Sequence, residues 1–254
     1  MKVPGGPSPD SPQRSILVVG GGSGIGMACG ELANEWGWRV FVGDIAMPTA
    51  AAAFENTVPV QIDVRSTDSV ARALQEIEAK TPVLDGVIYT AGVIDPAPAT
   101  ETSDESWERM FDVHVQGAHR VLRAAHPLLV RSDQAAVCLT SSIAARIGVN
   151  TRVSYCAAKS AVDGMVRGLA TEWAPDGIRV NGVAPGYTET PLMQEAVASG
   201  LLDMSQLLAR VPMHRVASTA EIAAVMAFLI SDQASYVTGQ IIAVDGGLTT
   251  SGDW

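Results

Sequence analysis

The sequence predicts an α/β fold in which a doubly wound, seven-stranded parallel sheet carries helices on both faces. From Ser15 onward, short β-branched runs alternate with longer helical patterns, which is the arrangement of repeated βαβ units. Such apolar runs are typical of parallel strands buried on both faces. No internal repeat or linker follows residue 14, so we expect residues 15–254 to form a single domain.

Seven short segments are predicted as strands, a number that suits a doubly wound sheet. In chain order they are residues 16–19, 39–43, 59–62, 84–89, 135–140, 178–183 and 240–244. A helix is predicted over 67–79, capped by Ser66 or Thr67, and another over 221–230, led by Ser218 or Thr219. Longer helical stretches at 106–130 and 151–173 have apolar and polar faces that could pair across a dimer axis. These faces predict a homodimer.

The composition indicates a globular protein with small-molecule partners. Apolar residues make up 47% of the chain and charged residues 17%, enough apolar surface for a sizeable core. Seventeen basic and 27 acidic side chains give a net charge of −10, which argues against nucleic acid or an anionic membrane as partner. The three cysteines have neither metal-ligand spacing nor the pattern of a disulfide framework, so we expect no metal and a cytoplasmic location.

Two segments do not fit the alternation of strands and helices. Residues 1–14 are rich in Pro, Gly and Ser and lack an apolar stretch, so we expect a disordered tail rather than a signal peptide. Residues 187–215 form a long segment between a strand and a helix, with several Leu and Met side chains. It is predicted to be either a mobile lid over a pocket or a surface helical hairpin whose methionines pack on the body.

A glycine-rich turn after the first strand predicts a nucleotide-binding site. Gly20, Gly24 and Gly26, with Ser23 and Ile25 between them, lie where backbone N–H groups can approach a pyrophosphate at the positive end of a helix. The spacing G-x-x-x-G-x-G differs from the commoner G-x-G-x-x-G, and a glycine cluster can also be a purely structural turn. The strand context favours the nucleotide site.

Acidic residues after the next two strands predict the kind of nucleotide. Asp44 ends the second predicted strand, where its carboxylate can accept hydrogen bonds from ribose hydroxyls and repel a 2′-phosphate. No Arg or Lys stands at 45 or within the glycine turn, so NAD is favoured over NADP. Asp63 and Val64, after the third strand, are expected at the adenine edge.

Tyr155 and Lys159 predict acid–base chemistry. Four residues apart on one helix they share a face, so the ammonium can favour the ionised phenol. An ordinary tyrosine pKa of about 10 makes the phenol a poor base near neutrality without such help. The alternative is a simple contact between a Tyr and a Lys on a helix surface.

These motifs, in this order, resemble those of the short-chain dehydrogenases/reductases over residues 15–249. The glycine turn resembles that family's T-G-x-x-x-G-I-G, and Tyr89-Thr90-Ala91-Gly92 its N-N-A-G. Ser142, 13 residues before Tyr155, matches the catalytic serine. Arg179 to Gly186 resembles R-V-N-x-V-x-P-G, and residues 236–240 and 244–247 resemble the C-terminal signature.

The resemblance implies a Rossmann fold, a homotetramer as the alternative to a homodimer, and a role for each matching residue. Tyr155 would remove the proton of a substrate hydroxyl, Ser142 would hydrogen-bond the same oxygen, and Lys159 would lower the pKa of the phenol and bind the nicotinamide ribose. Further cofactor contacts would come from Ala91, Gly92, Pro185, Gly186, Thr188 and Thr190.

Three positions depart from the family pattern. His114 stands where many relatives have an Asn that holds a water for proton relay. An imidazole could relay protons itself or be a buried structural side chain. Val19 replaces a Thr hydroxyl and Thr90 an Asn amide, which changes the hydrogen bonding of the cofactor loops.

The predicted substrate pocket is mostly apolar. Its expected walls are Ile94, Asp95, Ile143, Arg146, Tyr187 and Met193 of the lid. We expect an NAD-dependent dehydrogenase for a secondary alcohol or ketone on a medium-sized skeleton, cyclic or acyclic. Arg146 could bind a carboxylate or be a solvated loop residue. The alternatives are a non-catalytic NAD-binding sensor or scaffold, and a lyase or epimerase with transient hydride transfer.

Overall fold

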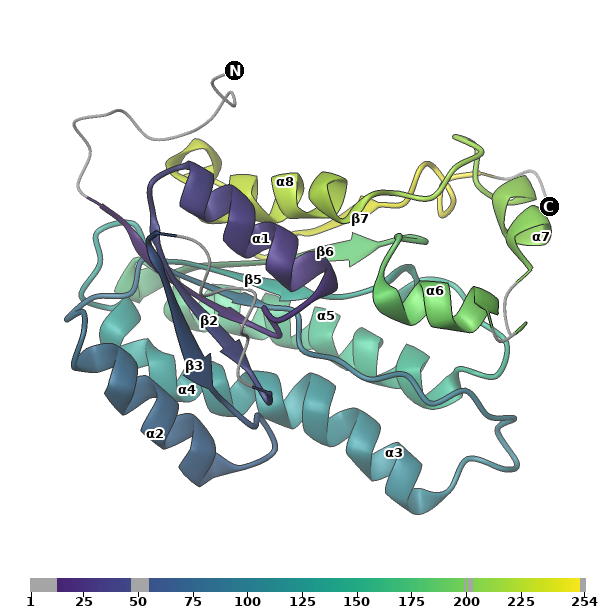
Figure 1. The fold of residues 1–254 in the computed structure, drawn as a ribbon, viewed down its shortest axis with the longest axis horizontal. Helices are drawn as coiled ribbons and strands as arrows, with labels where there is room; N and C mark the ends of the chain where they lie inside the picture. Colours follow the sequence, from purple (N-terminus) through teal and green to yellow (C-terminus); the bar gives the residue numbers. More distant parts are fainter. Residues whose placement is uncertain (1–12, 47–54, 199, 201–202, 252–254) are drawn as a thin grey trace.

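The protein is a seven-stranded parallel sheet between two layers of helices, as the sequence predicts. The computed structural model describes residues 13–46, 55–198, 200 and 203–251. The sheet order is β3-β2-β1-β4-β5-β6-β7, and every neighbouring pair is parallel. Strand order reverses between β1 and β4, where a crevice opens at the carboxyl ends of the strands. Figure 1 shows the strands fanning across the molecule between the helical layers.

The strands lie close to the predicted segments, with shifts of at most two residues at their ends. Their bounds are β1 Ser15–Val19, β2 Arg39–Asp44, β3 Thr57–Gln61, β4 Gly86–Tyr89, β5 Ala136–Thr140, β6 Arg179–Pro185 and β7 Ile241–Val244.

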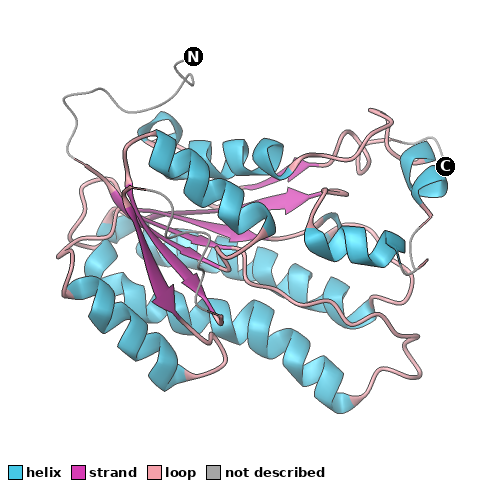
Figure 2. Ribbon diagram, in the orientation of Figure 1, coloured by secondary structure: helices cyan, strands magenta, loops and turns pink. Residues whose placement is uncertain are grey.

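Helices cover both faces of the sheet (Figures 1 and 2). On one face, α1 (Gly24–Glu35) packs beside α8 (Thr219–Ile230). On the other lie α2 (Thr67–Glu78), α4 (Ala118–Leu129) and the long α5 (Val153–Trp173). The predicted caps are present, because Ser66 accepts a hydrogen bond from Ser69 N and Ser218 forms a capping box with Glu221.

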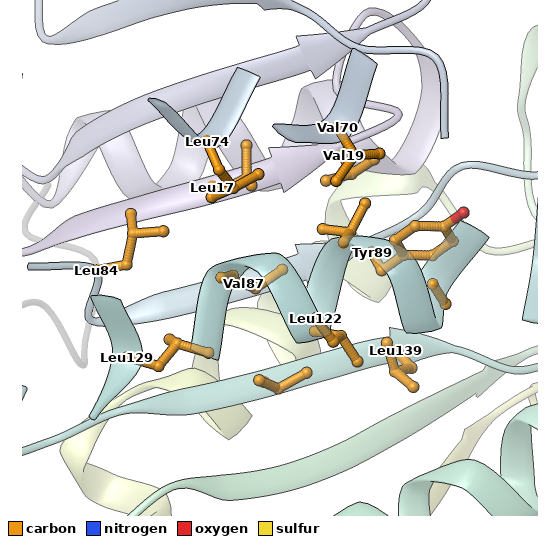
Figure 3. Close-up of a cluster of buried hydrophobic side chains, with 14 of the residues drawn as sticks. Leu17, Val19, Val70, Leu74, Leu84, Val87, Tyr89, Leu122, Leu129 and Leu139 are labelled. Carbon is orange, nitrogen blue, oxygen red and sulfur yellow. The ribbon is translucent and has the colours of Figure 1, made fainter. Parts of the chain in front are cut away.

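The buried side chains of β1 alternate between two hydrophobic cores. Leu17 and Val19 face the core shared with α2, α4 and α5 (Figure 3), whereas Ile16 and Val18 face the core shared with α1 and α8. All four side chains are at most 1% exposed. Burial on both faces explains why this strand is apolar at successive positions.

The helical stretch predicted over 106–130 is divided into three parts. Helix α3 spans Asp104–Phe111, a π-helical turn spans Asp112–Gly117, and α4 follows without a break. The π-turn carries His114 inward, where only 2% of the side chain is exposed. Such turns are rare and often occur at functional sites.

Two predicted segments fall partly outside the described residues. Residues 1–12 of the predicted tail lie outside them, but Arg14 is buried, donates hydrogen bonds to Asp85 O and Gln134 O, and stacks over Trp38. The described chain is therefore already packed before residue 15. In the predicted lid, α6 (Pro191–Ala198) and α7 (Met204–Ala209) are described.

Within the described residues no helix is both long and apolar enough to cross a membrane. The same residues contain no group of three or more His, Cys, Asp or Glu side chains placed to hold a metal ion.

Candidate active site

Two adjoining cavities open at the carboxyl ends of the strands. The glycine-loop cavity, about 500 Å³, is lined by the turn after β1 and by the ends of β2 and β3. The tyrosine cavity, about 580 Å³, is lined by residues after β4, β5 and β6 and by α6. Ile25, Thr90 and Thr140 line both, so the two cavities form one continuous site.

The glycine turn is shaped by close contacts that exclude side chains. Gly20 has φ +79°, and a Cβ there would lie 2.5 Å from Ala91 N. A Cβ on Gly26 would lie 2.2 Å from the carbonyl oxygen of Gly20. Thr90 Oγ1 donates to the carbonyl oxygens of Val19 and Gly20, at 2.9 and 3.1 Å. The hydroxyl of Thr90 thus stabilises the turn. The replacement of the family pattern's Asn by Thr did not predict this role.

We expect Gly26→Ala to destabilise the protein and to weaken nucleotide binding. The new methyl group would collide with backbone, and such overpacking costs about 1–3 kcal/mol. Gly30→Ala in the same helix is the matched control, because its Cβ would meet only Val40 and Val42 side chains at 3.7 and 3.8 Å. Thermal unfolding and NAD titration measure both effects. Wild-type stability and affinity in Gly26→Ala would show that the turn does not depend on this contact.

The two acidic residues of the glycine-loop cavity differ in how free they are. Asp44 Oδ2 accepts a hydrogen bond from Gly22 N at 2.9 Å, which fixes the carboxylate beside the turn. Asp63 is paired with Arg65, whose Nη2 lies 2.8 Å from Oδ2. The hydrogen bond from Arg65 holds the pKa of Asp63 below its usual range. Asp44 therefore has more capacity to accept hydrogen bonds from a ligand than Asp63.

The residues predicted to hold a dinucleotide all line the two cavities. Those of the glycine-loop cavity are Gly20, Ser23, Gly24, Ile25, Gly26, Asp44, Asp63, Val64, Ala91, Gly92 and Thr190. Those of the tyrosine cavity include Tyr155, Lys159, Pro185, Gly186 and Thr188. Between them, Thr140 Oγ1 is buried without a hydrogen-bond partner among the described residues. A side-chain-free turn, a placed carboxylate and an unpartnered hydroxyl fit a dinucleotide lying across both cavities.

Ser142, Tyr155 and Lys159 converge in the tyrosine cavity. Ser142 follows β5 and lines the same cavity as Tyr155. Burial raises the pKa of Tyr155 above its ordinary value, and the nearby Ser142 hydroxyl opposes that shift. Lys159 Nζ lies 5.5 Å from the centroid of the Tyr155 ring. The predicted proximity of the three groups is present in the fold.

A hydrogen bond to a backbone carbonyl holds the Lys159 ammonium in place. Its Nζ donates to Thr140 O at 2.7 Å. Burial lowers the pKa of Lys159 to about 7, against the favourable charge of Asp163. Asp163 in turn accepts a hydrogen bond from Ser141. Without a ligand, desolvation dominates both Lys159 and Tyr155, so the activation predicted from their spacing needs further charge or hydrogen bonds.

The imidazole of His114 is held in its neutral form, and only one of its two ring nitrogens has a hydrogen-bond partner among the described residues. Burial, with the nearby charge of Lys159, lowers its pKa to about 3. Its Nε2 lies 2.8 Å from Val93 O, its Nδ1 has no partner among the described residues, and its ring packs edge-on against Tyr155 with centroids 5.5 Å apart. A neutral imidazole can hold a water through Nδ1, whereas the low pKa argues against a relay through the imidazolium.

The depressed pKa of His114 makes stability depend on pH. Since the unfolded histidine binds a proton at a pKa of about 6.5 and the folded one only near 3, acid favours unfolding. The stability is fully present above about pH 6.5 and is lost as the pH falls toward 3. Between pH 7 and 4, the advantage of wild type over His114→Asn in unfolding free energy should shrink by about 3 kcal/mol.

Chemical denaturation at a series of pH values measures this difference. His119→Asn, at an exposed position on α4, is the control and should follow the wild-type pH dependence. Parallel curves for wild type and His114→Asn would contradict the assignment of a buried, neutral His114.

The structure divides the predicted substrate residues into two groups. Ile94 and Met193 line the tyrosine cavity. Ile143, Arg146 and Tyr187 are not among the described residues that line it: Arg146 donates to Ile241 O at 2.6 Å, and Tyr187 borders a separate small pocket. Asp95 accepts a hydrogen bond from Ser106.

The sequence analysis did not predict two charged residues of the tyrosine cavity. Arg152 lies at the start of α5 and Glu195 on α6, and both line the cavity. Arg152 stands three residues before Tyr155, about one helical turn away along the chain, and this spacing is the signal that could have revealed it.

Known proteins are similar to this chain in sequence and in fold. A family model described as enoyl-(acyl carrier protein) reductase matches residues 20–249. The cis-4-hydroxycyclohexanecarboxylate dehydrogenase of Sinomonas cyclohexanicum is 36% identical over 93% of this chain and 97% of its own length. The chain belongs to the short-chain dehydrogenase/reductase family. This short-chain dehydrogenase/reductase is therefore an oxidoreductase that uses a nicotinamide cofactor and acts on small molecules with alcohol or ketone groups.

Solved structures of similar proteins agree with this assignment. The aldohexose dehydrogenase of Thermoplasma acidophilum, in ligand-free form, superposes with a TM-score of 0.89 at 28% identity and covers 95% of this short-chain dehydrogenase/reductase and 96% of its own chain. ElxO with NADP bound superposes with a TM-score of 0.88 at 25% identity, over 94% of this chain and all of its own.

Proposed function

We propose that this protein is an NAD-dependent dehydrogenase that interconverts a secondary alcohol and a ketone on a medium-sized, cyclic skeleton. The observation that carries the proposal is the convergence of Ser142, Tyr155 and Lys159 in one cavity that continues into the glycine-loop cavity with Asp44. Acid–base groups and a dinucleotide site thereby share one continuous space.

In this mechanism the chain's own residues bind the substrate and move its proton. Ser142 Oγ and the Tyr155 phenol, which line the same cavity, would both contact the substrate oxygen. Tyr155 would accept the hydroxyl proton during oxidation and return it during reduction. Lys159, anchored on Thr140 O, would contribute positive charge beneath the phenol. A bound nicotinamide dinucleotide would supply the hydride acceptor or donor.

Asp44 supports NAD rather than NADP as the cofactor. Its carboxylate is held beside the turn by Gly22 N, with no cationic partner among the ion pairs of the described residues. A 2′-phosphate placed near it would meet like charge. Arg65, which also lines the glycine-loop cavity, is paired with Asp63 and so is already neutralised.

His114 completes the proposed site as a positioning residue. We propose that its neutral ring, fixed by Val93 and packed against Tyr155, holds a water through Nδ1 in place of the Asn of many relatives.

We further propose that the segment at about 187–215 covers the tyrosine cavity as a lid, because Leu192 and Met193 of α6 already line it.

The apolar walls support a compact hydrocarbon skeleton. The cavity that Tyr155 lines is also lined by apolar side chains, those of Val93, Ile94, Leu192 and Met193. The similarity to a dehydrogenase of a hydroxycyclohexane acid supports the same class of ring-bearing alcohol here.

We extend the proposal to the location and oligomeric state of the protein, which we propose to be a cytoplasmic homodimer or homotetramer.

The test follows nicotinamide reduction by absorbance across a panel of cyclic secondary alcohols, diols and polyols, with NAD and NADP in parallel. The proposal predicts turnover of at least one cyclic secondary alcohol with NAD, and much slower turnover with NADP. Tight binding of NAD without turnover of any alcohol or ketone would instead favour a non-catalytic sensor or scaffold.

A further inference from the structure

Arg152 places a fixed positive charge on the wall of the tyrosine cavity. It stands at the N-cap of α5, one turn before Tyr155, and lines the cavity together with Ser142 and Tyr155. Its positive charge favours the ionised form of the Tyr155 phenol. A ligand in this cavity would therefore share it with Arg152 as well as with Ser142 and Tyr155.

Neighbouring bonds hold Arg152 in place. Its Nη1 donates to Thr151 Oγ1 at 2.9 Å. Thr151 itself has φ +58°, a left-handed conformation that is unusual for a β-branched residue, and its carbonyl accepts a hydrogen bond from Ala97 N at 3.1 Å. The loop after β4 thus fixes the residue that orients the guanidinium.

The charge of Arg152 has no acidic partner within the described residues. None of their ion pairs includes Arg152, and its Nε and Nη2 groups make no hydrogen bond to them. Partial burial lowers the pKa of Arg152, and the nearby Tyr155, Cys156 and Tyr187 oppose that shift. A guanidinium remains charged at any physiological pH, so a planar anion would be a favourable partner.

We propose that Arg152 binds a carboxylate on the substrate, so that the preferred substrate is a hydroxy acid whose secondary hydroxyl meets Tyr155 and Ser142. This inference rests on the proposed function and names its substrate class. In this proposal Ser142 and Tyr155 contact the hydroxyl, the apolar walls contact the ring, and Arg152 binds the acid group. Arg146, the residue that the sequence analysis considered for this role, is held by Ile241 O outside the cavity lining.

Glu195 offers a competing partner for Arg152. It lines the same cavity from α6 and is exposed, so an ion pair between the two could close the cavity without any substrate acid. The two explanations make opposite predictions for Glu195→Gln. Loss of a competing carboxylate should preserve or strengthen binding of an acid, whereas loss of a closing ion pair should weaken acids and neutral ligands alike.

The experiment measures binding of cyclohexanecarboxylate and its neutral isostere, cyclohexanecarboxamide, to the NAD-loaded protein by calorimetry. Wild type should bind the acid more tightly than the amide by about 10- to 100-fold. Arg152→Gln should remove this preference while keeping the amide affinity, and Arg152→Lys should restore part of it. Arg123→Gln, an exposed arginine on α4, is the matched control and should behave as wild type.

Turnover separates this inference from the proposed function. With 4-hydroxycyclohexanecarboxylate and 4-methylcyclohexanol as substrates, Arg152→Gln should raise KM for the acid and leave KM for the neutral alcohol unchanged. Equal losses for both alcohols, with a shifted pH profile, would assign Arg152 to the Tyr155 phenol and overturn the inference. Equal affinity for acid and amide in wild type would also overturn it, while turnover of the neutral alcohol would leave the proposed dehydrogenase standing.

Discussion

Replacing Tyr155 with phenylalanine should lower kcat for alcohol oxidation by about 10²- to 10⁴-fold, the usual contribution of a positioned acid–base group. The phenol is the group that, with Ser142, would contact the substrate oxygen, and phenylalanine cannot accept a proton. Because the ring and its edge-on packing against His114 remain, the fold and the NAD affinity should change little. Steady-state kinetics and NAD titration measure the two quantities separately.

Tyr236→Phe is the matched control for this substitution. Tyr236 is fully exposed and should tolerate loss of its hydroxyl without any change in kcat. A Tyr155→Phe enzyme with wild-type kcat would refute the assignment of the proton acceptor. Loss of NAD binding alongside activity would instead indicate that the substitution disturbed the site as a whole.

Replacing Asp44 with serine should lower the preference for NAD over NADP, expressed as the ratio of kcat/KM values, by about 100-fold. Two effects combine: a charged hydrogen-bond acceptor for ribose hydroxyls is lost, and the repulsion of a 2′-phosphate disappears. Each contributes about 1.5 kcal/mol, and about 1.4 kcal/mol corresponds to a factor of ten.

Asp133→Ser is the control, because Asp133 is exposed near the start of β5, at the amino ends of the strands and away from the cavities. It should keep the wild-type cofactor ratio. An unchanged ratio in Asp44→Ser would mean that the choice of cofactor depends on other groups of the glycine-loop cavity, and would remove the main support for NAD.

Sequence alone predicted the fold because its determinants are local. Apolar runs of strand length and capped helical stretches specify βαβ units, and parallel strands then bring their carboxyl ends to one edge. Glycines at 20 and 26 are required by contacts shorter than a Cβ allows, so the turn left a clear pattern. The four-residue spacing of Tyr155 and Lys159 is also a local feature, and it predicted that both side chains share one helix face.

The substrate side of the site was harder to predict because several loops converge there. Arg146 and Arg152 both follow β5, and only the folded loop shows that the first bonds Ile241 O while the second lines the tyrosine cavity. The brace formed by Thr90 is likewise invisible in sequence, since its hydroxyl reaches two carbonyls across the turn. The electrostatic balance at Lys159 depends on burial, which residue spacing does not report.

The most direct test of the account is the fate of the carbinol hydrogen. Cyclic secondary alcohols deuterated at the carbinol carbon, with and without a carboxylate on the ring, would be incubated with the protein and NAD, and the products analysed by mass spectrometry. The account predicts one deuterium transferred to the nucleotide for each ketone formed. Deuterium retained in a product formed without net reduction of NAD, as a lyase or epimerase would give, or no transfer from any of these alcohols, would contradict it.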